Sequence, residues 1–290
     1  TPQPNAPGFP GGFGRVFTQA EFYEFLPTVS CAVTERLSIG GGPTVTMGEL
    51  IVDPLVFAAP DDADGTFAPR YPSGRGTRMA WGGGAQLGAY YIMDNGLHFG
   101  ANIKTPQWME EFRFFSEDEL GRPRTEKVDF DLPMIFTLGT AYSGIDGVVL
   151  AVDLRYIDFK NTDGLGGEGF NADGSVKGLG WSSVFVVATG LQLKMTERLY
   201  LRGGYTYNQT PIHSADTTFA VGAPLYYQHE ASIGGSWAIC DNVWLNLAYT
   251  YFFEASATGP IVTPFGNVPG SSVTLHETVH VASLGVSVRY

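Results

Sequence analysis

The chain has 290 residues, of which 44% are hydrophobic, 13% aromatic and only 16% charged, and 38 are glycines. Soluble domains average about 25% charged residues and about 7% glycine, so this composition argues against an ordinary soluble helical protein, while its many apolar residues argue against disorder. The net charge of −12 argues against nucleic acid as a partner, and no run of about 18 apolar residues is present to form a helical membrane span. A β-protein in contact with lipid fits these values.

Six segments show the alternation of apolar and polar residues that is typical of strands between lipid and a polar interior. In the segment from Leu150 to Tyr156, for example, apolar side chains alternate with a face that carries Asp153 and Arg155. Five further segments, of about 22–33, 79–92, 132–142, 182–194 and 227–239, alternate less regularly, and the third of these is apolar on both faces. In chain order, the predicted strands cover residues of about 17–33, 37–48, 79–92, 97–109, 130–142, 148–158, 182–194, 199–208, 227–239, 243–253 and 279–290.

Short and long connections alternate between these strands. The short turns lie at residues 34–36, 94–96, 144–147, 196–198 and 240–242, and the long connections near residues 48–78, 110–128, 158–181, 208–226 and 254–277. Outer-membrane barrels have this arrangement, with short periplasmic turns and long extracellular loops. The sequence therefore predicts an all-β protein, a single antiparallel transmembrane β-barrel domain over residues 1–290, in the bacterial outer membrane.

The predicted strand number is odd, whereas bacterial single-chain barrels have an even number of strands. Backbone groups inside a bilayer must all be hydrogen bonded, so a spanning sheet has to close on itself. Either the strand count is wrong by one or the chain begins partway through a barrel, and the second interpretation is preferred. Cys31 and Cys240 are predicted on strands that are not neighbours, and no disulfide is expected between them.

Three stretches of the sequence resemble a known family. They are residues 131–156, with the motifs DLP, GTAY and VDLRY; residues 190–212, with a strand that ends at Tyr207 and the pair Pro211-Ile212; and residues 280–290, HVASLGVSVRY. These stretches resemble the FadL family of outer-membrane transporters for long-chain fatty acids and other hydrophobic compounds. The resemblance implies a barrel of fourteen strands with an N-terminal hatch and a kinked third strand that opens the wall sideways. The eleven predicted strands would be the fourth to the fourteenth, with no counterpart of the hatch or of that kink.

Two long connections contain apolar and aromatic residues that are candidates for a ligand-binding surface, because a hydrophobic ligand gains about 25 cal/mol for each Å² removed from water. Family members hold ligand first in a groove between the corresponding loops, so the resemblance implies the same role here. The alternative is that these side chains form the loops' own packing cores or an aromatic girdle. The candidates are Leu55, Val56 and Phe57 in the first connection, and Trp108, Phe112, Phe114 and Phe115 in the second.

Polar residues on the predicted inner faces of the strands are candidates for guiding a carboxylate, or else for ion pairs that stiffen the barrel. They are Lys104, Asp153, Arg155, Lys194, Arg202 and Glu230. In relatives that carry fatty acids, basic side chains bind the acid headgroup, whereas this chain has Glu49 and Ser182 at the strand ends where such residues are expected. That difference favours neutral hydrocarbons or aromatic compounds over anionic fatty acids.

Residues 276–280 match the zinc-protease motif H-E-x-x-H. The two histidines of that motif bind one zinc ion only on a helix, whereas in a strand they lie about 13 Å apart. Because the motif leads directly into a predicted strand, a metalloprotease is only a remote alternative. Two acidic groups lie in the long connections: Asp61, Asp62 and Asp64 in the first, and residues 117–119 in the second. They are interpreted as a Ca²⁺ site, as a bridge to surface lipids through divalent ions or, in preference, as solvated loop charge.

The sequence as a whole predicts a channel for passive uptake of hydrophobic small molecules such as fatty acids, hydrocarbons or aromatic compounds. No catalysis, cofactor or bound metal is expected. The expected partners are outer-membrane lipids and the hydrophobic ligand, with other outer-membrane or periplasmic proteins as further candidates. The alternative to transport is a structural function, in which the barrel scaffolds a larger outer-membrane assembly.

Overall fold

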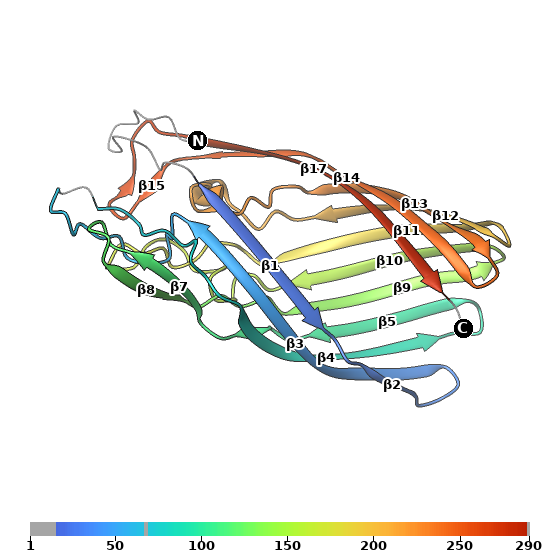
Figure 1. Ribbon diagram of the computed structural model, residues 1–290. Helices are drawn as coiled ribbons and strands as arrows, with labels where there is room; N and C mark the ends of the chain where they lie inside the picture. The colour runs from blue at the N-terminus through green and yellow to red at the C-terminus, as the bar shows by residue number, and fades with distance from the viewer. Residues whose placement is uncertain (1–15, 67–68, 289–290) are drawn as a thin grey trace.

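The computed structural model describes residues 16–66 and 69–288, which form strands, two short 3₁₀ helices and loops (Figure 1). No helix among these residues is long and apolar enough to cross a membrane. The strands are β1 (Phe17–Phe25), β2 (Val29–Ala32), β3 (Leu37–Asp53), β4 (Ala80–Ile92), β5 (Leu97–Lys104), β6 (Trp108–Met109), β7 (Phe112–Glu117), β8 (Pro123–Val128), β9 (Ile135–Ile145), β10 (Val148–Ile157), β11 (Val184–Thr196), β12 (Leu199–Asn208), β13 (His229–Cys240), β14 (Val243–Gly259), β15 (Val262–Thr263), β16 (Gly266–Asn267) and β17 (Val273–Val288). The helices are η1 (Ser214–Asp216) and η2 (Phe219–Val221).

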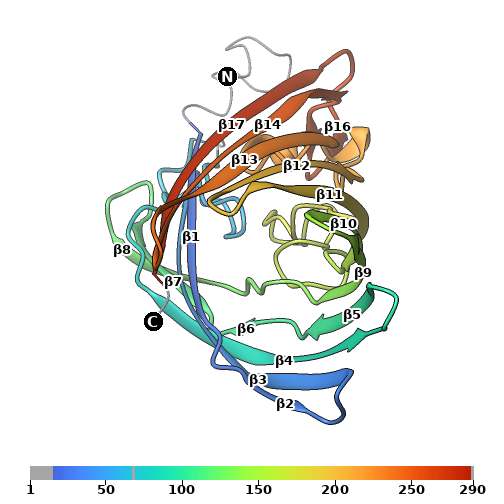
Figure 2. The ribbon, with the colours of Figure 1, turned by 90° about the vertical axis from the view of Figure 1, so that its right-hand side faces the viewer.

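One antiparallel sheet forms the wall, in the order β1-β3-β4-β5-β9-β10-β11-β12-β13-β14-β17, with β2 paired to β3 and β6 paired to β4. Figure 2 shows this sheet curved into the wall of a barrel. Strands β1 and β17 are the two ends of the order, and no pairing between them is found in the described residues. The observed order confirms the predicted all-β antiparallel fold class.

The two faces of the wall differ as the alternation predicts. Leu150, Val152 and Leu154 of β10 are 41–46% exposed on the face that the pattern assigns to lipid. On the opposite face, Glu24 of β1 and Lys104 of β5 form an ion pair, although β3 and β4 lie between their strands. Side chains can meet across two intervening strands only on the concave side of a sheet, so this second face lines the interior.

Several strands differ in length from the prediction. The second and tenth predicted segments continue to Asp53 and Gly259, and the last begins at Val273, because β3, β14 and β17 extend beyond the period-two segments into the long connections. The fifth begins at Ile135 rather than near residue 130. The final residues of the predicted strand 279–290, Arg289 and Tyr290, lie outside the described residues.

The predicted strand 17–33 is divided into β1 and β2 by residues 26–28. Pro27 has no backbone N–H to donate, so it cannot continue a hydrogen-bonded ladder. Both pieces still pair with β3, β1 through residues 45–53 and β2 through residues 38–41. The interruption therefore lies within one wall strand at the edge of the sheet.

The predicted strand 97–109 is also divided, into β5 and β6, by three residues that bulge toward the interior. Among them Gln107 is fully buried, and its Oε1 accepts hydrogen bonds from the hydroxyls of Thr44 (2.5 Å) and Thr46 (3.1 Å) of β3. The bulge passes over Gly84 of β4 and the start of β6 passes over Gly82, where an added Cβ would clash with the backbone oxygens of Pro106 and Trp108, respectively. The glycines are therefore required by this close approach.

Candidate functional site

The long connections fold at the end of the barrel opposite the short turns, where Figure 1 shows β7, β8 and β15. We call these connections the cap. Its first part packs around a hydrophobic cluster to which Phe22, Phe57, Met109 and Phe130 also contribute from the edge. The buried members of this cluster are Leu50, Val52, Leu55, Ala58, Ala80, Phe112, Phe114 and Val128.

Three of the predicted ligand-binding residues belong to this packing core. Leu55, Phe112 and Phe114 are each 0% exposed, and the rings of Phe22 and Phe130 lie edge-on to Phe112 with centroids 6.3 and 6.4 Å away. Side chains in this position are available to a ligand only if the cluster opens. The sequence could not separate them from surface residues, because the connections have no regular period to indicate which side chains point inward.

The remaining predicted ligand-binding residues are accessible to different degrees. Trp108 is 59% exposed and Phe115 is 56% exposed, whereas Val56 and Phe57 are half-buried. Phe115 immediately follows the fully buried Phe114 in β7, so the two rings point to opposite sides of the β7–β8 hairpin. Trp108 is paired with Gly83 of β4, which is itself paired with Val45 of β3, so its ring lies on the face that the pattern assigns to lipid. Apolar surface that a ligand can contact without unfolding of the cap is therefore found at Phe115.

The cap continues through loops that are far apart in the sequence. The N–H of Val176 donates to the carbonyl oxygen of Val56 (2.8 Å), and the hydroxyl of Tyr71 donates to the carbonyl oxygen of Gly174 (2.7 Å). Burial raises the pKa of Tyr71 to about 12, so its hydroxyl remains a donor at neutral pH. These bonds join the connection after β3 to the one between β10 and β11.

A second hydrophobic cluster extends the cap toward β14 and β17. Ile212, Ala220 and Tyr226 are buried in it, and they lie in the connection that contains η1 and η2. Trp181 packs against the cluster from the connection before β11, and Leu275 packs against it from β17. The long connections therefore form packed structures of their own.

Below the cap, a chain of hydrogen bonds between neutral groups and one arginine crosses five neighbouring wall strands. Arg202 donates to Gln192 Oε1 (2.7 Å) and to Ser236 Oγ (2.6 Å). Ser236 Oγ donates to Asn246 Oδ1 (2.5 Å), and Asn246 Nδ2 donates to Ser287 Oγ (2.9 Å). Of these residues the prediction named only Arg202, although the polar positions of the alternating strands were a usable signal for the others.

The other predicted interior residues divide into paired and unpaired groups. Lys104 is paired with Glu24, and Lys194 Nζ lies 2.8 Å from the carboxylate of Glu197 in the turn after β11. The predicted interior residues without an ion pair in the described part of the chain are Asp153, Arg155, Arg202 and Glu230. The two lysines are therefore neutralised by acidic neighbours.

A cavity of about 630 Å³ adjoins this hydrogen-bonded chain. Arg202, Gln192 and Asn246 form part of its lining, and small side chains form much of the rest. These small residues are Ala151, Gly190, Gly204, Gly234, Ala248 and Gly285. Because small side chains project little from the wall, they leave room in the interior at this level.

The H-E-x-x-H motif lies within β17, as predicted, and not on a helix. His276 Nδ1 lies 3.6 Å from Glu254 Oε1, whereas His280 Nδ1 is hydrogen bonded to the Tyr249 hydroxyl at 2.7 Å. Glu277 accepts a hydrogen bond from the N–H of Tyr226 (2.9 Å). The motif residues thus have three separate sets of neighbours, and the arrangement of a zinc protease is not formed.

Comparison with solved structures gives FadL-type barrels. The P. putida toluene transporter TodX is 14% identical with a TM-score of 0.64, over 94% of this chain and 70% of that chain. The Ralstonia pickettii toluene transporter TbuX is 14% identical with a TM-score of 0.66, over 97% and 70% of the two chains. A Pseudomonas aeruginosa FadL homologue is 14% identical with a TM-score of 0.67, over 93% and 68%. At these identities the likeness establishes the fold.

A search of curated protein sequences gives no match. The family described as "Outer membrane protein transport protein (OMPP1/FadL/TodX)" matches residues 6–290, which is nearly the whole sequence. The match confirms the predicted resemblance and the outer-membrane location. The chain therefore belongs to the OMPP1/FadL/TodX family of outer-membrane transport proteins.

Proposed function

We propose that this protein is a passive channel that admits small neutral hydrophobic molecules, with monoaromatic hydrocarbons as the substrate class. The family match over residues 6–290 carries the proposal, because it makes the protein an outer-membrane transport protein. Among its structural relatives, TodX and TbuX are toluene transporters. A scaffolding role has no comparable support.

The pairing of the interior lysines favours a neutral substrate over a fatty acid. Binding a carboxylate in a partly desolvated site requires a cation that is not already neutralised. Lys104 and Lys194 are paired with Glu24 and Glu197. Arg155 and Arg202 have no ion pair in the described part of the chain, although Arg202 already donates two hydrogen bonds to neutral acceptors. A neutral aromatic molecule needs no such cation and gains mainly from removal of its surface from water.

We further propose that Phe115 makes the first contact with the substrate. Its ring is more than half exposed, and an aromatic face offers a large apolar area with favourable ring–ring geometries. The packing core beneath this surface would hold it in place through the fully buried Leu55, Phe112 and Phe114. The half-buried Val56 and Phe57 would connect that core to the exposed surface.

Uptake into intact cells tests the proposal. The protein would be expressed in a bacterial strain that lacks related channels and does not metabolise toluene, and initial uptake of radiolabelled toluene and of radiolabelled oleate would be measured. We expect faster toluene uptake than in cells with empty vector, no change on addition of a protonophore, and little change for oleate. Equal toluene uptake with and without the protein would contradict the proposal. Faster uptake of oleate alone would indicate that the substrates are fatty acids and not monoaromatic hydrocarbons.

The role of Phe115 has a matched control. F115A should slow toluene uptake, whereas F265A should not, because Phe265 is fully exposed but lies in the separate β15–β16 turn. Outer-membrane amounts of each variant would be compared by immunoblot. Equal effects of the two substitutions would remove Phe115 from the proposed path.

A further inference from the structure

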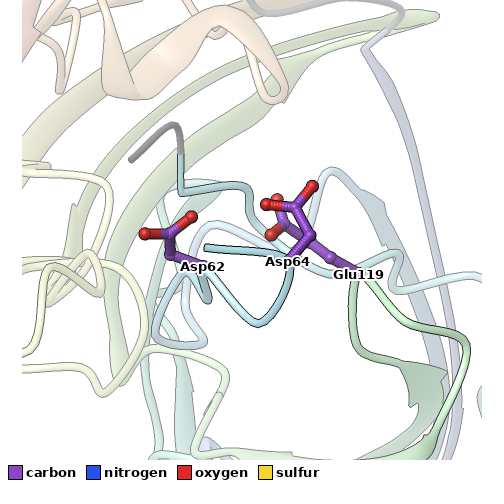
Figure 3. A group of neighbouring side chains, drawn as sticks. All are labelled: Asp62, Asp64 and Glu119. Atoms are coloured by element: carbon purple, nitrogen blue, oxygen red, sulfur yellow. The ribbon is translucent and has the colours of Figure 1, made fainter. Parts of the chain in front are cut away.

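Three carboxylates from two separate cap loops converge at one point. Asp62 and Asp64 lie in the connection after β3, and Glu119 lies at the tip of the β7–β8 hairpin (Figure 3). One oxygen atom from each of the three side chains lies within 4.8 Å of the others. Residues far apart in the sequence are thus brought within the reach of one ion.

Contacts outside the group hold the two loops together. Asp61 Oδ2 accepts a hydrogen bond from Arg124 Nη1 (2.8 Å), and Asp61 Oδ1 accepts one from the backbone N–H of Glu119 (3.2 Å). Arg124 Nη2 also donates to the carbonyl oxygen of Ala59 (2.6 Å). Asp61 is therefore occupied in joining the loop to the hairpin, and the neighbouring carboxylates are placed by a framework that does not depend on them.

Glu119 differs from an ordinary solvated loop residue. Its side chain is only 7% exposed, and neither carboxylate oxygen accepts a hydrogen bond from a residue that the structure describes. The nearest cationic atom is Arg70 Nε, 3.7 Å from Oε1, on a side chain that is 75% exposed. A buried carboxylate is costly without close compensation. Burial, together with the nearby carboxylates of Asp64 and Asp61, raises the pKa of Glu119.

We propose that Asp62, Asp64 and Glu119 bind a divalent cation, Ca²⁺, which joins the loop after β3 to the β7–β8 hairpin. Carboxylate oxygens from irregular loops suit Ca²⁺, which accepts variable geometry, better than Mg²⁺, which requires a near-ideal octahedron. The group contains no histidine or cysteine, the ligands that favour zinc or copper. Asp62 and Asp64 also have the alternate spacing of carboxylates in calcium loops, followed by Gly65 with φ of 69° at a sharp turn.

Calorimetric titration with CaCl₂ of the detergent-purified protein, after removal of metals with EDTA, tests the site. We expect one Ca²⁺ per chain, with weaker binding of Mg²⁺. E119Q should weaken Ca²⁺ binding at least tenfold, whereas E117Q should leave it unchanged. Glu117 lies in the same hairpin, and its substitution removes the same charge but no member of the group.

Hydrogen exchange followed by mass spectrometry gives a second readout. Ca²⁺ should slow exchange in residues 59–66 and 117–122 of the wild type and of E117Q, but not of E119Q. If E119Q fails to fold, as judged by circular dichroism, D64N provides the same test at an exposed side chain. Absence of binding at millimolar Ca²⁺, or equal affinity of E119Q and E117Q, would overturn the proposal, and neither result depends on the transport function.

Discussion

The neighbouring residues Phe114 and Phe115 allow the packing role and the ligand role of the cap to be separated. Phe114 is 0% exposed within the first cap cluster, and Phe115 is 56% exposed on the other side of the same hairpin. Replacement of each by alanine removes the same atoms from adjacent positions. We expect F114A to destabilise the hairpin and F115A to slow substrate uptake with little effect on stability.

The expected magnitudes follow from burial. Phe-to-Ala substitutions in a packed core cost about 3–5 kcal/mol, because the lost transfer free energy is added to the cost of the cavity. Complete burial of a phenylalanine is worth roughly 1.5–3 kcal/mol, so removal of the half-exposed Phe115 ring should cost no more than about 1.5 kcal/mol. The two substitutions should therefore differ by at least about 1.5 kcal/mol in the free energy of local opening.

Hydrogen exchange of the β7–β8 hairpin measures that free energy directly. Each 1.4 kcal/mol corresponds to about a tenfold change in an equilibrium constant, so F114A should accelerate exchange of the hairpin amides by roughly 10²- to 4 × 10³-fold. F115A should accelerate it by about tenfold at most. The same exchange rates in both variants would refute the assignment of Phe114 to a packed core and Phe115 to a surface.

Two further predictions concern buried polar groups of the cap and wall. Q107L should leave the hydroxyls of Thr44 and Thr46 without their acceptor in a buried site, and should destabilise the barrel by about 1–3 kcal/mol for each group, measured by urea unfolding in detergent. The raised pKa of Tyr71, about 12, contributes stability that is complete below the pKa of an unfolded tyrosine, near 10, and is lost as the pH rises toward 12. Y71F should remove this loss between pH 10 and 12 and should also remove the bond to Gly174, as followed by tyrosinate absorbance and hydrogen exchange.

The wall could be predicted because each strand has two chemically different environments. In β10, the alternation of Leu150, Val152 and Leu154 with Asp153 and Arg155 reflects lipid on one side and the interior on the other. The same requirement acts on every membrane-spanning strand. The ends of β3 and β14 lie beyond the membrane-spanning segments, where their side chains pack in the cap instead of contacting lipid. The sequence therefore predicts loops at these two strand ends.

The bulge at Gln107 could not be predicted for a related reason. A glutamine followed by Trp108 and Met109 continues an acceptable strand sequence, and nothing local indicates that Gln107 turns inward. Its burial depends on the two β3 threonines that bond it and on Gly82 and Gly84, which give it room. These partners are about 20 to 60 residues away in the sequence, so the burial of Gln107 can be explained only from the tertiary structure.

The interior charges offer a physical reason for the choice between hydrophobic substrates. A wall that carries lysines would retain anions if the lysines were unpaired, but Glu24 faces Lys104 across two strands and each is less than a quarter exposed. Such a pair keeps the interior hydrated while it presents no net charge at that point. Arg155 and Arg202 have no ion pair among the described residues, and Arg202 is bonded to neutral groups in a chain that extends to Ser287. A hydrophobic molecule that carries no charge would pass the Glu24–Lys104 pair without displacing it, whereas a carboxylate would have to compete with Glu24 for Lys104.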